Sequence, residues 1–334
     1  MSAGVVLHIG PPKTGSTYLQ NIVWRNRDAL RRQGLEYPAA HDNEHFLAAY
    51  DVQGGAFVHA DLPEAAGTWE QVVARVHNYP GRSLISHEIL ALSRPRHIQR
   101  ILESLHPAPV DVVVMGRCLA DVLPSTYQEK VKQRDPDVSW PDFLGNCDRP
   151  DGMWGHRLGP LVERWQAAFG AQHVHVVTVP PRAVPRRRLL DRFARVVGFE
   201  AAGLDVRPAD TNDSLDMLDV VLLQHVVRRT RATLSWHEHR DLMSRLVPVL
   251  RTADRPRQRL LMPASARRWM KREAAESIRA VSESGCRVYG DLADLLPRAE
   301  CFSSTGSGLA AVSTAEVLEA AVDALLTTAF RADS

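Results

Sequence analysis

The chain contains no long apolar run and carries little net charge. No apolar stretch approaches the roughly 18 residues that a membrane span needs, and the first one, at 5–9, is also too short for a secretory signal. A net charge of +2 over 334 residues gives no basis for general binding to nucleic acid or to a membrane surface. We therefore expect a cytoplasmic protein with no nucleic-acid partner and no membrane partner.

Cysteine is also scarce. The chain has four, Cys118, Cys147, Cys286 and Cys301, and they lie far apart in the sequence. No pair has the spacing of a metal-binding or redox motif. We expect ordinary reduced thiols and predict no metal site.

Lysine supplies only four of the 41 basic residues, and one of these, Lys13, lies in an unusual loop sequence. The stretch 10–17 reads Gly-Pro-Pro-Lys-Thr-Gly-Ser-Thr, which has the Gly-x4-Gly outline of a phosphate-binding loop. In an ATP- or GTP-binding loop the lysine directly follows the second glycine. Here Ser16 holds that place, so the loop keeps the outline of an anion cradle but moves its positive charge.

The residues around this loop predict a strand before it and a helix after it. Residues 5–9 form a short apolar run, and residues 18, 19, 22 and 23 have helical spacing. A glycine loop in that context points backbone N–H groups and a helix N-terminus at an anion. We expect Lys13, Thr14, Gly15, Ser16 and Thr17 to bind one. The alternative is a Gly/Pro turn that only joins strand to helix.

The sequence His8-Ile-Gly-Pro-Pro-Lys-Thr-Gly-Ser-Thr-Tyr-Leu-Gln20 resembles the 5′-phosphosulfate-binding motif of sulfotransferases that use 3′-phosphoadenosine-5′-phosphosulfate (PAPS). A second stretch, Arg117-x3-Asp121-x3-Ser125-x-Tyr127, follows the apolar run 110–116 and resembles the 3′-phosphate-binding motif of the same family. The resemblance extends weakly over about residues 4–300 and is stronger to bacterial members. It implies that Arg117 and Ser125 join the loop residues in binding PAPS.

The spacing of the second motif has a physical reason. Arg117 ends a predicted strand, where ligands bind in open α/β sheets, and Ser125 lies about two helical turns further on. The planar guanidinium suits a phosphate. The alternatives are a surface ion pair for Arg117 and an ordinary helix hydroxyl for Ser125.

A second predicted strand, 83–87, supplies candidates for a catalytic base. It ends in Ser86-His87-Glu88, and bacterial members often end this strand in Ser-x-Glu. Strand alternation would put Ser86 and Glu88 on one face and His87 on the other. We favour Glu88 over His87 as the base and assign Lys13 to the charge that develops during transfer. The alternative for Glu88 is a carboxylate that only begins a helix.

Other candidates are weaker. We expect His8 to orient the loop or to pack beneath it, and His41 and His45 to be solvated loop histidines. Trp154, His156 and Trp165 are candidates for lining an acceptor cleft, although aromatic residues at helical spacing are more often core.

The expected fold is α/β, a three-layer arrangement with a mainly parallel sheet and helices on both faces, as in the P-loop-like sulfotransferase fold. Strands at 4–9, 83–87, 110–116 and 173–179 alternate with helical patterns at 16–32, 95–105, 119–133 and 155–169. Residues 38–68 predict an irregular excursion, and extra helices follow at 214–230, 237–251 and 264–283. We divide the chain into a sulfotransferase domain (1–300), a flexible linker (301–313) and a C-terminal helix (314–330).

The resulting hypothesis is a PAPS-dependent sulfotransferase that acts on a hydroxyl or amine of a small-molecule or carbohydrate acceptor, without a metal. The alternatives are a small-molecule kinase and a non-catalytic nucleotide-binding protein on the same fold. The sequence identifies neither the acceptor nor the oligomeric state, and a homo-oligomer is left open.

Overall fold

The computed structural model describes residues 2–55, 62–133, 137–149, 151–153, 155–207, 215–252, 255, 257–303 and 309–331. The chain forms two compact units. The first unit comprises residues 1–119, 153–210 and 271–296, and the second comprises 120–152, 211–270 and 297–334.

The first unit is built on a six-stranded sheet in which every neighbouring pair of strands is parallel. The strand order is β2-β3-β1-β4-β5-β6. The strands are β1 (Gly4–Gly10), β2 (Leu35–Glu36), β3 (Arg82–Ser86), β4 (Val110–Gly116), β5 (Val174–Thr178) and β6 (Arg287–Tyr289). The central strand β1 therefore has β3 on one side and β4 on the other.

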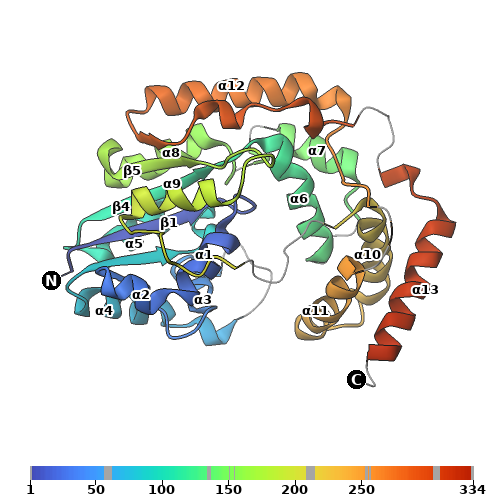
Figure 1. The fold of residues 1–334 in the computed structure, drawn as a ribbon, viewed down its shortest axis with the longest axis horizontal. Helices are drawn as coiled ribbons and strands as arrows, with labels where there is room; N and C mark the ends of the chain where they lie inside the picture. The colour runs from blue at the N-terminus through green and yellow to red at the C-terminus, as the bar shows by residue number, and fades with distance from the viewer. Residues whose placement is uncertain are drawn as a thin grey trace. The chain divides into compact units, whose positions relative to one another are not determined.

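Helices cover both faces of this sheet, as the apolar strands predict. Every residue of β1 is buried, which is typical of a parallel strand with helices above and below it. Val5 and Leu7 pack in one apolar cluster with α3, α4, α5 and α8, whereas Val6 packs in another with α1, α2 and α9. The helices are α1 (Ser16–Arg25), α2 (Arg27–Arg32), α3 (Glu44–Val52), α4 (Thr68–Asn78), α5 (Pro95–Leu105), α8 (Leu158–Phe169) and α9 (Arg187–Val197). Figure 1 shows these helices around the central strands, so the predicted fold class is confirmed.

The second unit is helical in the part of it that the structure describes. Its helices are α6 (Leu119–Lys132, whose first residue belongs to the first unit), α7 (Trp140–Asp148), α10 (Met217–Thr230), α11 (Trp236–Thr252) and α13 (Thr314–Arg331). A capping box begins α10. The Asp216 side chain accepts a hydrogen bond from the Asp219 amide, and the Asp219 side chain accepts one from the Asp216 amide. Helix α13 packs on α10 and α11. Helix α12 (Arg267–Glu283) has residues in both units.

Several boundaries differ from the sequence-based expectation. The predicted helix 16–32 is two helices, α1 and α2, separated at Asn26. The supposedly irregular stretch 38–68 contains the nine-residue helix α3, whose Leu47, Ala48 and Ala49 are buried; residues 56–61 lie outside the described part. Of the predicted linker, residues 304–308 also lie outside it, and Phe302 is buried and bridges Met262.

Among the described residues, no helix combines the length and the apolar character that crossing a bilayer would require.

Candidate functional site

Three loops that carry candidate residues leave the sheet at the same edge. Because β3, β1 and β4 are adjacent and parallel, their carboxyl ends meet there. β3 lies on one side of β1, and the next strand in the sequence, β4, lies on the other side. The strand order therefore changes direction at β1, and ligands of open α/β sheets bind at such a switch point. This edge places the loop after β1, the turn after β3 and Arg117 after β4 in one neighbourhood.

The loop after β1 has a backbone that its glycines permit. Gly10 and Gly15 have φ angles of 79° and 94°, and Lys13 has φ 65° although it is not glycine. A Cβ on Gly15 would lie 2.8 Å from the Cδ2 atom of Leu189 on α9. The loop therefore turns left-handed at its lysine and packs closely against the helix beneath it.

The carbonyl groups of this loop are hydrogen-bonded by side chains. The Thr14 hydroxyl donates to the Pro11 carbonyl at 2.5 Å. His156 Nε2 lies 3.2 Å from the Pro12 carbonyl oxygen, and the Arg117 guanidinium donates to the Lys13 carbonyl at 2.5 Å. Since a carbonyl can only accept, His156 carries its proton on Nε2.

The neutral state of His156 has a physical cause. Burial lowers its pKa to about 4, against the opposing bond to Pro12, and the charge of Lys13 lowers it further. His156 thus holds the loop as a neutral donor, and its suggested place in the lining of an acceptor cleft stays a prediction. Trp165 is core, stacked on Phe169, and Trp154 lies outside the described residues.

Ser16, which stands where an ATP-binding loop has its lysine, is the first residue of α1. It is 3 % exposed, and its hydroxyl has no hydrogen-bond partner among the described residues. The first hydrogen bond of the helix runs from the Leu19 amide to the Gly15 carbonyl, so the first-turn amides have no intrahelical acceptor. A buried hydroxyl and a helix N-terminus together favour an anion at this position.

Arg117 follows β4 and contacts the loop directly. Its bond to the Lys13 carbonyl connects the two predicted cations of the first unit through the loop backbone. That bond uses one of the five N–H donors of a guanidinium. Ser125 belongs to the second unit, where its hydroxyl lies 3.4 Å from the Asp121 carbonyl oxygen of the preceding helical turn.

Glu88 lies in the turn after β3 rather than on the strand. β3 ends at Ser86, and Glu88 begins the short 3-10 helix η2 (Glu88–Leu92), so the strand-alternation argument for its face does not hold. The residue nonetheless packs against the loop, because a Cβ on Gly10 would lie 2.6 Å from the Glu88 Cβ. The side chain of Gln20 on α1 donates to Glu88 Oε2 at 3.1 Å.

The pKa of Glu88 is lowered from its ordinary value. Burial alone would raise this pKa, but His87, the residue's own amide, Gln20 and His8 together hold it down. Glu88 is therefore ionised at neutral pH and can accept a proton.

His8 lies beside the end of β3, and its expected role in orienting the loop after β1 or packing beneath it stays a prediction. It is fully buried on β1, its ring centroid lies 5.0 Å from that of Phe193, and its Nδ1 lies 2.7 Å from the Ser86 hydroxyl. Burial lowers its pKa to about 4, with Glu88 acting in the opposite direction and His87 lowering it further. The histidine that lies just before the loop is thus uncharged at neutral pH.

Two further histidines accept backbone hydrogen bonds in the same region. The Ser86 amide donates to His45 Nδ1, and the Ile89 amide donates to His87 Nδ1, both at 3.3 Å. Burial lowers the pKa of His45 to about 3 and also lowers that of His87. The expectation that His45 is solvated is wrong, because it lies in α3 with 2 % exposure, whereas His41 is exposed. The apolar spacing at 48, 49 and 52 was the signal for this helix.

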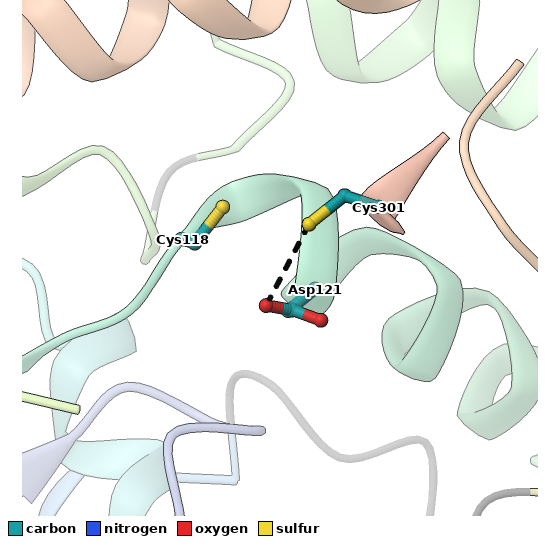
Figure 2. Close-up of side chains that lie close together, drawn as sticks. All are labelled: Cys118, Asp121 and Cys301. Carbon is teal, nitrogen blue, oxygen red and sulfur yellow. Dashed lines mark hydrogen bonds between the residues drawn. The ribbon is translucent and has the colours of Figure 1, made fainter. Parts of the chain in front are cut away.

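The cysteines contain one contact that spacing could not show. Within the second unit, Cys301 Sγ lies 4.0 Å from Asp121 Oδ2 (Figure 2), across 180 residues of sequence. The figure also draws Cys118, on the segment that leads into α6. Arg298 donates to the same Asp121 oxygen at 3.0 Å, so this carboxylate is already paired with a cation.

Comparisons with known proteins give little further identification. No family model matches the chain, and no curated protein sequence matches it. Among solved structures, the chain is similar to the crystal structure of a sulfotransferase from Alicyclobacillus acidocaldarius, with 14 % sequence identity and a TM-score of 0.42. The alignment covers 70 % of this chain and 98 % of that one. Similarity at this level assigns no residue a role.

Proposed function

We propose that this protein is a sulfotransferase that moves a sulfuryl group from PAPS to a hydroxyl or amine of a small-molecule or carbohydrate acceptor. The observation that carries the proposal is the buried hydroxyl of Ser16, unpartnered among the described residues, at the N-terminus of α1. It stands beside a loop whose carbonyls at 11, 12 and 13 are occupied by other side chains. Such a loop is suited to present N–H and O–H donors to an anion.

Each residue then has a distinct task toward the donor. PAPS supplies an activated sulfuryl group when it is bound. The Thr14–Thr17 segment binds its 5′ end through amides and hydroxyls, and Lys13 provides a positive charge for the oxygen on which charge develops. Arg117 and Ser125 are assigned to the 3′-phosphate on the strength of the sequence motif alone. A cytoplasmic location belongs to the same proposal, because PAPS is made and used there in bacteria.

The hydrogen bonds favour Glu88 over His87 as the base. A backbone N–H can only donate, so the bond from Ile89 occupies the Nδ1 lone pair of His87. A neutral imidazole then carries its proton on Nε2 and has no lone pair left for the acceptor. Glu88 is ionised and lies against Gly10 of the loop, so it can take the proton from the acceptor oxygen or nitrogen.

The experiment compares adenosine 3′,5′-bisphosphate, the product of PAPS, with ADP. We expect the bisphosphate to raise the melting temperature clearly more than ADP does, and labelled sulfate to pass from PAPS to at least one member of an acceptor panel. Equal stabilisation by the two nucleotides would reject the proposal. Glu88→Gln should retain the thermal shift and lose transfer, whereas His87→Gln should retain both.

One observation keeps a small-molecule kinase as the second candidate. Glu88 follows the strand next to β1, which is where a carboxylate that holds Mg²⁺ could stand beside a phosphate loop. Against this, Ser16 replaces the lysine that should follow Gly15. Tight ATP binding that depends on Mg²⁺ would favour the kinase, and binding of the bisphosphate that persists in EDTA would favour the sulfotransferase.

A further inference from the structure

We propose that Gln20 is a positioning residue that holds the Glu88 carboxylate in place beside the end of β3. The catalytic meaning of this inference depends on the proposed function, but its physical content does not. Gln20 Nε2 lies 3.1 Å from Glu88 Oε2, 3.2 Å from the Ser86 carbonyl oxygen and 3.3 Å from the Ser86 hydroxyl. One side-chain amide on α1 therefore spans the end of β3 and the carboxylate that follows it.

The chemistry of the partners fixes the orientation of this amide. A carbonyl oxygen and a carboxylate oxygen can only accept hydrogen bonds, so the Gln20 atom that faces both must be the NH2 nitrogen. Its two hydrogens match these two acceptors. Among the described residues, Gln20 is the one side chain that donates a hydrogen bond to Glu88.

The Ser86 hydroxyl connects this amide to the buried histidine. Its oxygen lies 2.7 Å from His8 Nδ1 and 3.3 Å from Gln20 Nε2. His8 is held by full burial and by its ring contact with Phe193. The anchor of Gln20 is thus a rigid strand end rather than a mobile loop.

The titratable groups around Glu88 are neutral at neutral pH, so the amide of Gln20 is an important partner of the Glu88 carboxylate. The titratable side chains that act on it are His8 from β1 and its neighbour His87, and Glu88 in turn acts on Tyr37, which follows β2. Burial lowers the pKa of both histidines and raises the pKa of Tyr37, so all three are neutral at neutral pH. Lys13 belongs to the loop on the same edge and is unchanged in the Gln20 variants. The amide dipole of Gln20 is the contribution that a substitution can remove.

The test is a carboxyl titration that needs no activity. In protein labelled with 13C at the Glu δ-carbon, the Glu88 signal is assigned by its loss in Glu88→Gln. Gln20→Met keeps the length of the side chain and removes the donor, so the Glu88 pKa should rise by about one unit. Gln20→Glu should raise it further, because a second carboxylate would then face the first. An unchanged Glu88 pKa in either folded variant would overturn the inference.

A matched pair on the surface serves as the control. Gln99 Nε2 donates to Glu103 Oε1 at 2.8 Å on α5, where both side chains are exposed. Gln99→Met should leave the Glu103 pKa nearly unchanged, because water replaces the lost donor. An equal shift at both pairs would show that the half-buried setting of Gln20 and Glu88 contributes nothing.

A kinetic measurement separates this inference from the proposed function. In Gln20→Met the acidic limb of the kcat/KM profile should move upward together with the Glu88 pKa, while the KM for PAPS stays unchanged. If wild type transfers no sulfuryl group but the pKa still shifts, the proposed function fails and the positioning role stands. If wild type is active and the pKa does not shift, the positioning role fails and the function stands.

Discussion

The loop after β1 and the turn after β3 lie at the same sheet edge, but they differ in how their hydrogen-bond donors are used. In the loop, Thr14, His156 and Arg117 hydrogen-bond three successive carbonyls, while the buried Ser16 hydroxyl meets no partner among the described residues. In the turn, a carboxylate is already present, and it is held by a neutral amide beside histidines of lowered pKa.

The loop after β1 is thus a candidate site for an anion from outside the protein, whereas the turn after β3 holds the carboxylate of Glu88 as part of the chain. The Ser16 hydroxyl and the first-turn amides of α1 would form hydrogen bonds only when an anion binds. Until then, the buried Ser16 hydroxyl carries a desolvation cost that no bond offsets. A half-buried carboxylate such as that of Glu88 is charged in the free protein and needs its hydrogen bonds whether or not a ligand is bound. The two regions therefore predict different responses to substitution, one visible in ligand binding and the other in the free protein.

The largest expected effect is on the loop. Lys13→Ala should lower the rate of sulfuryl transfer by roughly 10²–10³-fold, because it removes a charge aimed at the developing anion. It should leave the free energy of unfolding nearly unchanged, because the Lys13 side chain is partly exposed. Transfer rate and urea unfolding measured on the same preparation check both parts.

Lys271→Ala is the control for this change, since Lys271 is an exposed lysine on α12. It should alter neither quantity. If Lys13→Ala loses no more activity than Lys271→Ala, the loop does not use its displaced lysine.

The second effect concerns the buried, neutral His8 beside the end of β3. His8 stays neutral in the folded protein down to about pH 4 and would accept a proton near pH 6.5 when unfolded. The unfolded state therefore binds more protons in this window, so stability falls as pH drops from 6.5 toward 4, by up to about 3 kcal/mol from His8. His8→Asn should remove this part of the pH dependence, measured as the free energy of unfolding between pH 7 and pH 4.

The exposed His41 provides the matching substitution. His41→Asn should leave the pH dependence of stability as it is in wild type. A difference between wild type and His8→Asn that stays constant with pH would mean that His8 is not held neutral by burial.

The comparison also explains which region the sequence could predict. The residues of the loop are contiguous, so the motif at 10–17 marked this candidate site without knowledge of the fold. The central strand β4 and helix α5 begin and end where apolar spacing placed them.

The support of Glu88 could not be predicted in that way. It is assembled from His8, Gln20, Ser86 and His45, which come from four elements and meet only after the sheet has formed. The end of β3 at Ser86 was equally hidden, because an alternating pattern does not mark where a strand turns into a 3-10 helix. What local spacing encodes was accessible, and what tertiary packing brings together was not.

The third prediction tests the point where the two regions touch. Gly10→Ala and Gly34→Ala both place alanine at a positive φ angle, 79° and 84° respectively, which costs roughly 1–2 kcal/mol. A Cβ at Gly34 would meet no atom within 4 Å, whereas one at Gly10 would meet Glu88 at 2.6 Å. Gly10→Ala should therefore lose about 2 kcal/mol more stability than Gly34→Ala, from overpacking. Equal losses in urea unfolding would indicate that Glu88 moves aside freely and is not fixed against the loop.

The smallest expected effect is on ligand binding, and it distinguishes the Ser16 hydroxyl at the loop from a buried hydroxyl elsewhere in the sheet. Ser16 and Ser83 are both buried, and neither hydroxyl has a hydrogen-bond partner among the described residues. Removing such a hydroxyl should leave stability equal or slightly higher in both Ser16→Ala and Ser83→Ala, because no bond is lost. Only Ser16→Ala should weaken binding of adenosine 3′,5′-bisphosphate, by roughly tenfold, since only Ser16 lies at the helix N-terminus beside the loop. Calorimetric titration of the two variants decides the matter, and equal affinities would mean that the unpartnered Ser16 hydroxyl is a packing defect rather than part of an anion site.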